Sequence, residues 1–538
     1  MTDKILKESN LVIVPDPGTA AGNLHAGRGA AEKTYTANSF DPATADTGLT
    51  YTPGRVARYM YNRYQPTPGY KVFGYLSDWG IYDGRYGENF DDQNVDYRIG
   101  GRGTDIMRLL TPNGSPPLYD KIIVGFTAII GDQGANEDTI NAAALDFKIA
   151  SSPGDLPAQR GRATFTDPWG DVAAYVNCGF NSWISNDYPM LFDANRAQGV
   201  LGALVKLHRQ SPSMTIGMSL GGWTMSQAFH HIAKEPIARE KLAESLKNIV
   251  IKFPMFTELD LDWEYPGVEG APGNDYGPED ADNYALLIRA IKDALPNVKI
   301  SIATIAVPEK LEQANIPKLI EAGVEGLNVM TYDFFGSPWA DRLMHHTNLF
   351  RPLTGFTPPL NSANDAVSYL IGLGIDSKMI NIGFASYTRN AQRAEIERTS
   401  PLTGRYEPRQ PNEDNTVGSF EAALTEWPDL LRLYLDEDLE GINGFELHRD
   451  AQCKAEFLYN DQTGVFMSIE TPRTVLEKAR YVKDNNLGGL FLWMIDSDNG
   501  LLTNAAREGL GAQLVAPATV DMARFYNPGK NARSDEKS

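Results

Sequence analysis

Eight short runs of β-branched and aromatic residues recur along the chain from Tyr70, and longer amphipathic runs lie between several of them. The amphipathic runs, such as REKLAESLKNIVIKF and TPRTVLEKARYVKDN, carry apolar residues at the i, i+3, i+4 and i+7 positions of a helix. A strand–helix unit repeated eight times predicts an α/β protein, a parallel (β/α)8 TIM barrel. The predicted strands begin at Lys71, Lys121, Met214, Glu258, Val298, Gly326, Met379 and Gly488.

Two connections, from Gly131 to about Ala194 and from about Thr388 to Glu470, are too long for simple crossovers. Connections of this length usually carry structure or function of their own. We expect the second one to be an α+β subdomain inserted after strand seven. The predicted organisation is an N-terminal extension or small module (1–67), barrel strands one to seven (68–387), the inserted subdomain (388–470), barrel completion with strand eight (471–514) and a disordered polar tail (515–538).

The chain has 538 residues and a formal net charge of −20. This charge argues against a nucleic-acid partner, because neutralising phosphates requires Lys and Arg. A neutral polymer suits an acidic protein better. No stretch approaches the roughly 20 apolar residues of a membrane span, and the N-terminal run LVIV is too short for a signal peptide. The sequence therefore predicts neither a membrane span nor a recognisable export signal.

Two cysteines, Cys178 and Cys453, cannot build a disulfide framework or a zinc site. We expect two free buried thiols, with one disulfide bridge as the alternative. His345 and His346 stand side by side, but no third ligand follows at a fixed spacing, so we predict loop residues and no metal site.

The predicted fourth strand, within FTELDLDWEYPG, sends acidic side chains in one direction. Leu259, Leu261 and Trp263 alternate with Asp260, Asp262 and Glu264, and the acids should face the barrel interior. Each buried carboxylate costs several kcal/mol unless it is paired or protonated. A solvated strand face or a set of paired structural acids is the alternative, but a parallel strand flanked by helices seldom faces water. Stacked acids push their pKa values apart, so Glu264, nearest the rim, is the candidate general acid.

These residues resemble the DxxDxDxE signature of glycoside hydrolase family 18, the chitinases. Further stretches are similar to family motifs and occur in the family's order: FGYLSDWGIY, SLGGWTMS (SxGG), NVMTYDFFG (Met-x-Tyr-Asp), FASYTR (Tyr-x-Arg) and GGLFLWMIDSDNG. The match spans about Tyr70 to Leu510. One position departs from the pattern, because Thr257 stands where the family has its first Asp. We expect this change to remove a buried charge beneath the other acids and to alter the pH profile.

The resemblance implies substrate-assisted hydrolysis of β-1,4-linked N-acetylglucosamine polymers, with no cofactor and no enzyme nucleophile. Glu264 would act as acid and then base, and Asp262 would orient the acetamide group. Asp260 would exchange a hydrogen bond with Asp262. By the same resemblance, Tyr332 would bind the acetamide oxygen and Asp333 would help to hold the sugar, while the inner acid would be braced by Tyr75 and Ser219.

Sugar rings have apolar faces, so glycan clefts use aromatic platforms. By resemblance, Trp493 would lie beneath the cleaved sugar, and Tyr387 and Arg389 match the seventh-strand pair. Ordinary core packing, or a structural Arg, is the alternative for these positions. Weaker candidates for substrate contacts are Trp79, Phe126, Trp223, Met330 and Trp339.

The sequence therefore predicts an endo-acting chitinase whose partners are chitin or chitooligosaccharides. An endo-β-N-acetylglucosaminidase of the same family and a non-catalytic chitin-binding lectin are the alternatives, and the retained Glu264 argues against the lectin. Chitin lies outside cells, so we expect an extracellular site of action. Similar chitinases of insect-pathogenic bacteria are components of toxin complexes, and the N-terminal extension could dock the chain into a protein assembly.

Overall fold

The computed structural model describes residues 60–82, 106–111, 115–175, 177–337, 339–353, 360–407, 418, 422–436 and 438–526. Most of the predicted N-terminal extension, residues 1–59, lies outside this part of the chain. So does the end of the predicted tail, residues 527–538.

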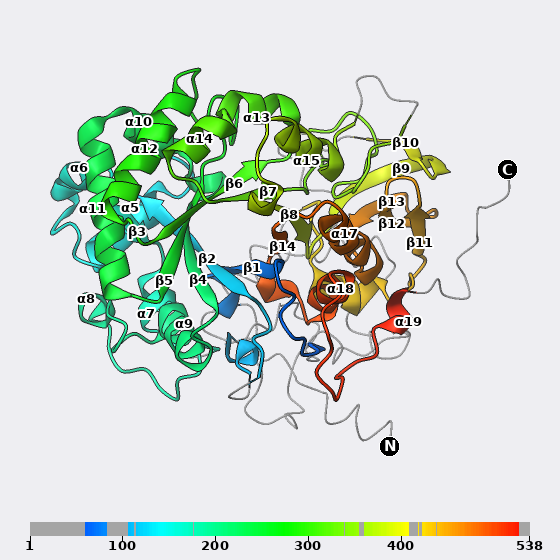
Figure 1. The fold of residues 1–538 in the computed structure, drawn as a ribbon, viewed down its shortest axis with the longest axis horizontal. Helices are drawn as coiled ribbons and strands as arrows, with labels where there is room; N and C mark the ends of the chain where they lie inside the picture. The colour runs from blue at the N-terminus through cyan, green and yellow to red at the C-terminus, as the bar shows by residue number, and fades with distance from the viewer. Residues whose placement is uncertain are drawn as a thin grey trace.

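Eight parallel strands form a closed barrel (Figure 1). Each predicted strand is present, and pairing of the first strand with the second closes the sheet, as Phe73 lies opposite Lys121. The prediction of a (β/α)8 barrel is therefore confirmed. The strands are β1 (Lys71–Ser77), β2 (Lys121–Ile129), β4 (Thr215–Gly221), β5 (Phe256–Asp262), β6 (Lys299–Ile305), β7 (Gly326–Met330), β8 (Ile380–Ala385) and β14 (Gly489–Trp493).

Helices cover the outside of the barrel and bury the outward side chains of the strands (Figure 1). On β5, for example, Trp263 stacks on Phe229 at 5.4 Å and contacts Tyr284 at 5.0 Å between ring centroids. The main outer helices are α9 (Gly199–Gln210), α10 (Gln227–Lys234), α11 (Pro236–Lys252), α12 (Asp280–Ala294), α13 (Pro308–Ala314), α14 (Ile316–Ala322), α15 (Ala363–Gly372), α17 (Pro472–Asp484) and α18 (Leu501–Gly509).

The long connection after β2 carries its own secondary structure. A short strand, β3 (Ala163–Phe165), pairs antiparallel with the end of β2 and extends the sheet at the rim. The helices of this connection are α5 (Glu137–Asp146), α6 (Leu156–Gln159), α7 (Pro168–Val172) and α8 (Tyr188–Leu191).

The long connection after β8 forms a separate antiparallel sheet, which confirms the predicted insertion. Its strand order is β10-β9-β13-β12-β11, and Figure 1 shows it beside α17. Lys478 of α17 and Glu470, which follows β13, form a fully buried ion pair that fastens the insertion to the barrel. The elements are β9 (Arg389–Thr399), β10 (Leu402–Glu407), α16 (Trp427–Asp429), β11 (Glu446–Asp450), β12 (Ala455–Asn460) and β13 (Val465–Ile469).

The chain beyond Val515 differs from the predicted disordered tail as far as residue 526. Met522 and Phe525 are buried, and the short helix α19 (Ala523–Tyr526) forms there. Asn62 accepts the backbone amides of Thr519 and Val520 at 2.7 and 3.0 Å, so the segment that enters the barrel holds the segment that leaves it. The sequence prediction missed this because the tail is polar in composition apart from a few apolar residues such as Met522 and Phe525.

Both cysteines are buried and free, as predicted. Within the described residues, no helix combines the length and the apolar character that crossing a membrane would require.

Candidate active site

The inward face of β5 carries a column of acids, and its lower end differs from the sequence prediction. The pairing of β5 with β4 shifts register between Ile216 and Gly217, so that Gly217 lies opposite Glu258. Thr257 falls at this irregularity and is exposed, whereas Glu258 is buried. The expectation that Thr257 lies beneath the other acids was therefore wrong, because alternate residues share a face of a strand and Glu258, not Thr257, is in step with Asp260. Glu258 occupies that place.

Asp260 is completely buried and accepts four side-chain hydrogen bonds. Tyr75 and Ser219 donate to Oδ2, both at 2.9 Å, while Ser301 and Asn328 donate to Oδ1 at 2.7 and 3.0 Å. Burial raises the pKa of Asp260, and these donors act against that rise. The donors therefore favour the ionised form of this carboxyl over that of its neighbour on the strand.

Asp262 has no comparable support. Burial and the nearby carboxyls of Glu264 and Asp260 raise its pKa far above the ordinary value. The predicted hydrogen bond between Asp260 and Asp262 is not formed, and Oδ1 of Asp262 is buried without a partner within the described part of the chain. The four donors already occupy Asp260, so one acceptor atom of Asp262 remains available to a ligand.

Glu264 lies two residues beyond the end of β5, at the rim of the barrel. The hydroxyl of Ser226 accepts the backbone amide of Glu264 at 2.9 Å and donates to the carbonyl of Asp262 at 3.0 Å. Burial, with a smaller contribution from Asp333, raises the pKa of Glu264 to about 7. A carboxyl with that pKa can donate a proton near neutral pH and recover it later.

Two glycines at the end of β4 bring the backbone against the acid strand. At Gly221, which has φ of 108°, a Cβ atom would lie 2.3 Å from the carbonyl oxygen of Asp262. At Gly222, φ is 89° and a Cβ would press on the ring of Phe126 at 3.0 Å. Only glycine fits at these two positions of positive φ. From this turn the Gly222 amide donates to the backbone carbonyl of Asp262 at 2.8 Å.

Tyr332 and Asp333 follow β7 at the same rim. The Tyr332 ring lies over Gly383, where a Cβ would approach it to 2.5 Å. Burial raises the pKa of the Tyr332 hydroxyl, and Asp262 is the strongest of the charged groups that add to this effect. The hydroxyl therefore remains a hydrogen-bond donor beside the acid column.

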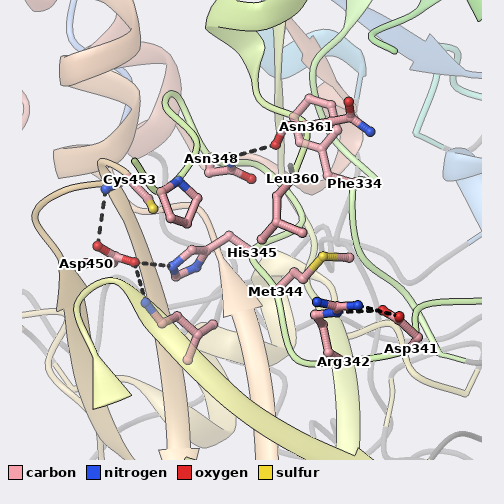
Figure 2. Close-up of a pocket in the computed structure, with 12 residues that line it drawn as sticks. Phe334, Asp341, Arg342, Met344, His345, Asn348, Leu360, Asn361, Asp450 and Cys453 are labelled. Carbon is pink, nitrogen blue, oxygen red and sulfur yellow. Dashed lines mark hydrogen bonds and ion pairs between the residues drawn. The ribbon is translucent and has the colours of Figure 1, made fainter. Parts of the chain in front are cut away.

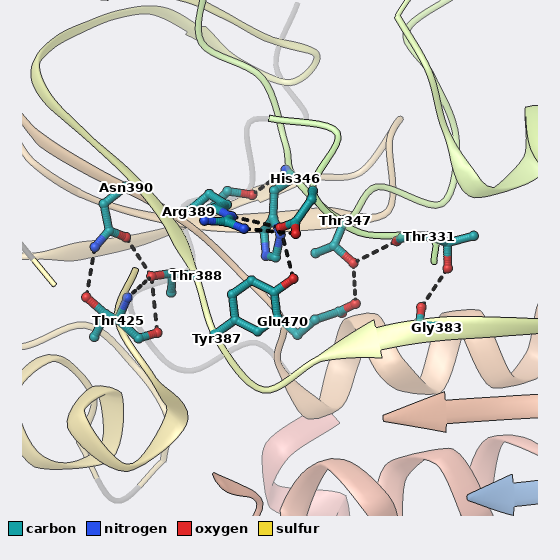
Figure 3. Close-up of polar contacts among 12 residues, drawn as sticks. Thr331, His346, Thr347, Gly383, Tyr387, Thr388, Arg389, Asn390, Thr425 and Glu470 are labelled. Carbon is teal, nitrogen blue, oxygen red and sulfur yellow. Dashed lines mark hydrogen bonds and ion pairs between the residues drawn. The ribbon is translucent and has the colours of Figure 1, made fainter. Parts of the chain in front are cut away.

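Asp333 is held by a bidentate contact with Arg389, from Nε and Nη2 at 2.8 and 2.9 Å. The Tyr387 hydroxyl donates to the same carboxylate at 2.9 Å, and Nδ1 of the buried His346 lies 3.7 Å away. Burial alone would raise the pKa of Asp333, but the Arg389 charge and its hydrogen bonds outweigh burial and hold that pKa well below the usual range. Figure 3 shows Tyr387, Arg389 and His346 gathered where β8 passes into the insertion.

Aromatic rings form one wall above the acids. Trp493 packs against Tyr75 and Phe126 at 5.7 and 5.6 Å between centroids, and Trp79 stacks on Phe126 at 6.3 Å. Met330 packs on the cluster of Tyr75, Tyr332 and Tyr387 and is partly buried. The sequence-predicted ring of Trp493 thus lies between the inner donor Tyr75 and the outer pair of rings.

Two further predicted tryptophans are exposed. Trp223 is 48% exposed and meets Tyr265 edge-on at 6.3 Å. Trp339 is 57% exposed, with the Arg389 guanidinium 5.1 Å from its ring. Both rings offer free apolar faces outside the buried aromatic wall.

His345, Asp450 and Cys453 form a buried group around a pocket between the loop after β7 and the insertion (Figure 2). Their potential ligand atoms lie within 4.8 Å of one another, so they could in principle hold a metal ion. However, the Asp450 carboxylate already accepts the Ser400 hydroxyl at 2.9 Å and the Leu402 amide at 2.8 Å, and His345 Nε2 lies 3.0 Å from it. Burial raises the pKa of the Cys453 thiol. The arrangement fits a polar anchor of the β11–β12 hairpin better than a metal site.

Several residues that hold the acids were missed from the sequence. Ser301 and Asn328 bind Asp260, Ser226 binds Glu264, and Lys121 pairs with Glu258 at 2.6 Å. Polar side chains at inward positions of otherwise apolar strands could have marked Ser301 and Asn328. The Lys121 contact crosses from one strand to another two places away, and no local pattern reveals it.

Comparisons with known proteins agree with this geometry. The model of the family "Glycosyl hydrolases family 18" matches residues 71–498. The chain is 41% identical to Chitinase 1 of Yersinia entomophaga over 97% of this chain and 95% of that protein, and 36% identical to Chitinase 2 of the same organism over 90% and 78%.

Solved structures give the same result. The chitinase Chi1, whose crystal structure was fitted into the Yersinia entomophaga toxin complex, matches with a TM-score of 0.81 and 41% identity, covering 93% of this chain and 96% of that one. Chitinase ChiA74 from Bacillus thuringiensis, at 22% identity, shares the fold with a TM-score of 0.64 over 84% of this chain and 71% of that one. The family match covers most of the chain, and the chain therefore belongs to glycosyl hydrolases family 18.

Proposed function

We propose that this protein is an endo-acting chitinase that cleaves β-1,4 linkages between N-acetylglucosamine units with retention of configuration. The observation that carries the proposal is the placement of Glu264, with a pKa of about 7, at the rim of the acid column beside the unpaired Oδ1 of Asp262. The similarity to proteins named chitinases supports the choice of substrate.

In the first step, Glu264 protonates the glycosidic oxygen. Its raised pKa keeps a large fraction protonated near neutral pH, and Ser226 holds its backbone amide at 2.9 Å. The bond to the leaving sugar breaks, and its electron pair goes to the newly protonated oxygen.

The nucleophile in this proposal is the carbonyl oxygen of the substrate's own 2-acetamido group, which gives a cyclic oxazolinium ion. Asp262 accepts the acetamide N–H and stabilises the positive charge, while the Tyr332 hydroxyl donates to the acetamide oxygen. The second carboxyl, Asp262, ends β5 two residues before Glu264, and this placement suits charge stabilisation better than attack from the opposite face of the sugar. Glu264, now ionised, then deprotonates the water that opens the ring.

Substrate binding would use the aromatic surfaces. Trp493 would lie beneath the cleaved sugar, and the exposed rings of Trp223 and Trp339 would extend the path for a long chain. Asp333, fixed by Arg389, would hold the distorted sugar next to Tyr332. A path long enough for several sugars would favour internal cleavage.

Glu264→Gln tests the assignment. Hydrolysis of a chitin hexamer should fall by at least about a thousandfold, since the general acid and the base are lost together, while calorimetry should still detect binding of the oligomer. Glu244→Gln, an exposed carboxylate of α11, is the matched control and should leave the rate unchanged. Substantial residual hydrolysis in Glu264→Gln would refute the role of Glu264.

The N-terminal residues 1–59 are a candidate segment for assembly with other proteins. Because the similar Chi1 was fitted into a toxin complex, we infer that this chain joins a protein complex and that residues 1–59 dock it there, outside the cell where chitin lies. Met60 and Tyr64 are buried against the barrel, so the deletion that tests docking must stop before residue 60. The deletion should retain hydrolysis and lose co-purification with a partner; loss of hydrolysis would contradict a pure docking role.

A further inference from the structure

A buried ion pair lies at the floor of the barrel beneath the acid column. Lys121 Nζ, from the first residue of β2, is 2.6 Å from Glu258 Oε1, and the two side chains are only 5% and 6% exposed. The Lys121 ammonium also lies 3.9 Å from the centre of the fully buried Phe73 ring. Burying two charges costs more desolvation free energy than burying an apolar pair of the same size. Packing alone therefore does not explain why this position holds an ion pair.

The fold makes room for this pair. Lys121 and Glu258 belong to β2 and β5, which are separated by β4, and Gly217 of β4 lies opposite Glu258 on one side and opposite Ile123, two residues after Lys121, on the other. A Cβ atom at Gly217 would lie 3.4 Å from Cβ of Glu258 and 3.4 Å from Ile123. A side chain at Gly217 would therefore press on Glu258, the partner of Lys121.

The pair is connected to the reaction centre through Ser301. The Ser301 hydroxyl donates to Asp260 Oδ1 at 2.7 Å, and it also helps to keep the pKa of Glu258 low. Lys121 supplies the positive charge that acts on both, since it lowers the pKa of Glu258 and of Asp260.

We propose that Lys121 and Glu258 are positioning residues that set the charge state of Asp260 and, through it, the distribution of protons along the acid column. The inference rests on the proposed function, because it assigns the pair a part in the chitinase reaction. The other titratable groups near this part of the column are Lys71 and Tyr75 of β1, Asp120 before β2, Asp262 of β5, Lys299 at the start of β6 and Tyr332 after β7. Tyr284 of α12 lies on the outer side of β5.

The direction of the effect follows from charge. Asp260 and Asp262 are neighbouring carboxyls whose charges interact, and Asp260 is the more acidic of the two because of its donors. Its protonation therefore marks the acidic limb of the pH–rate profile. Removing the lysine charge raises the proton affinity of Asp260 and moves this limb to higher pH. Removing the glutamate charge while keeping the lysine moves the limb to lower pH.

The test compares Lys121→Met with Glu258→Gln in the full chain, using kcat for a chitin hexamer across pH. Shifts of about half a pH unit or more, in opposite directions, are expected for charges at this range. Thr257→Asp is the matched control, because it adds a charge on the adjacent residue outside the barrel and should leave the limb in place.

Coincident profiles for the wild type and both variants, or shifts in the same direction, would overturn the inference while the wild-type rate still supports the chitinase assignment. An inactive wild-type protein would overturn the assignment itself. If Lys121→Met does not fold, Glu258→Gln decides alone, because a purely structural pair predicts no shift toward lower pH.

Discussion

Replacing Tyr75 by Phe removes one hydroxyl from the barrel interior and keeps the ring. The ring is 2% exposed and packs on Phe491 and Trp493 at 5.6 and 5.7 Å, contacts that phenylalanine can retain. The lost hydroxyl donates to Asp260 at 2.9 Å and accepts from Asn328 at 3.0 Å. The substitution thus removes one of four donors that favour the ionised form of Asp260.

The loss of one donor sets the expected rise in the pKa of Asp260. A hydrogen bond to a charged group is worth about 1.5–3 kcal/mol net, and one pKa unit corresponds to about 1.4 kcal/mol. Because Ser219, Ser301 and Asn328 still donate to Asp260 and can shorten their contacts, we take the lower end. We expect the acidic limb of kcat for Tyr75→Phe to rise by about one pH unit.

The assay is initial-rate hydrolysis of a chitin hexamer at saturating concentration, from acid to neutral pH. Tyr284→Phe is the matched control. That tyrosine is equally buried, at 2% exposed, but its hydroxyl donates to the carbonyl of Leu261 at 3.3 Å on the outer side of the same strand. It should lose some stability without a change in the pH profile.

An unchanged acidic limb in Tyr75→Phe, together with normal folding, would refute the view that its hydroxyl controls the charge of Asp260. Equal shifts in both variants would show that the limb reports barrel stability rather than proton affinity.

Other predictions concern the rim and the insertion. Ser226→Ala should lower kcat by about tenfold to a hundredfold with KM little changed, because Glu264 loses its backbone support; normal kcat would contradict this. The basic limb of wild-type kcat should fall near pH 7, as Glu264 loses its proton, and Asp333→Asn should move it to lower pH by removing a nearby negative charge; a move to higher pH would contradict the assignment. Lys478→Met should cost about 3–5 kcal/mol in denaturant unfolding by leaving Glu470 buried and unpaired, and adding Glu470→Gln should restore most of it.

The barrel could be predicted from the sequence because its strands are apolar and separated by amphipathic helices. KIIVGFTAI coincides with β2, and ELDLDWE overlaps β5. The acid column followed from alternation alone between Asp260 and Glu264. Periodicity is a local signal, so it works wherever the strand is regular.

What was missed depended on the family pattern at Thr257 and on contacts across the barrel. The alternation that places Asp260 inside also places Glu258 inside and Thr257 outside, and the family pattern was followed in its place. Lys121 reaches Glu258 across another strand, so the contact depends on the register of three strands that are far apart in the sequence. The contact between Asn62 and the chain near Val520 joins residues more than four hundred positions apart, so composition alone indicated an unstructured tail.

In the proposed mechanism, the substrate's acetamide group displaces the leaving sugar with the assistance of Asp262 and Glu264. The most direct test is the anomeric form of the fresh product from a chitin hexamer, followed by NMR before mutarotation. Attack by the acetamide group predicts N-acetylated oligomers released first as the β-anomer. Release of the α-anomer, which requires direct displacement by water, would contradict it.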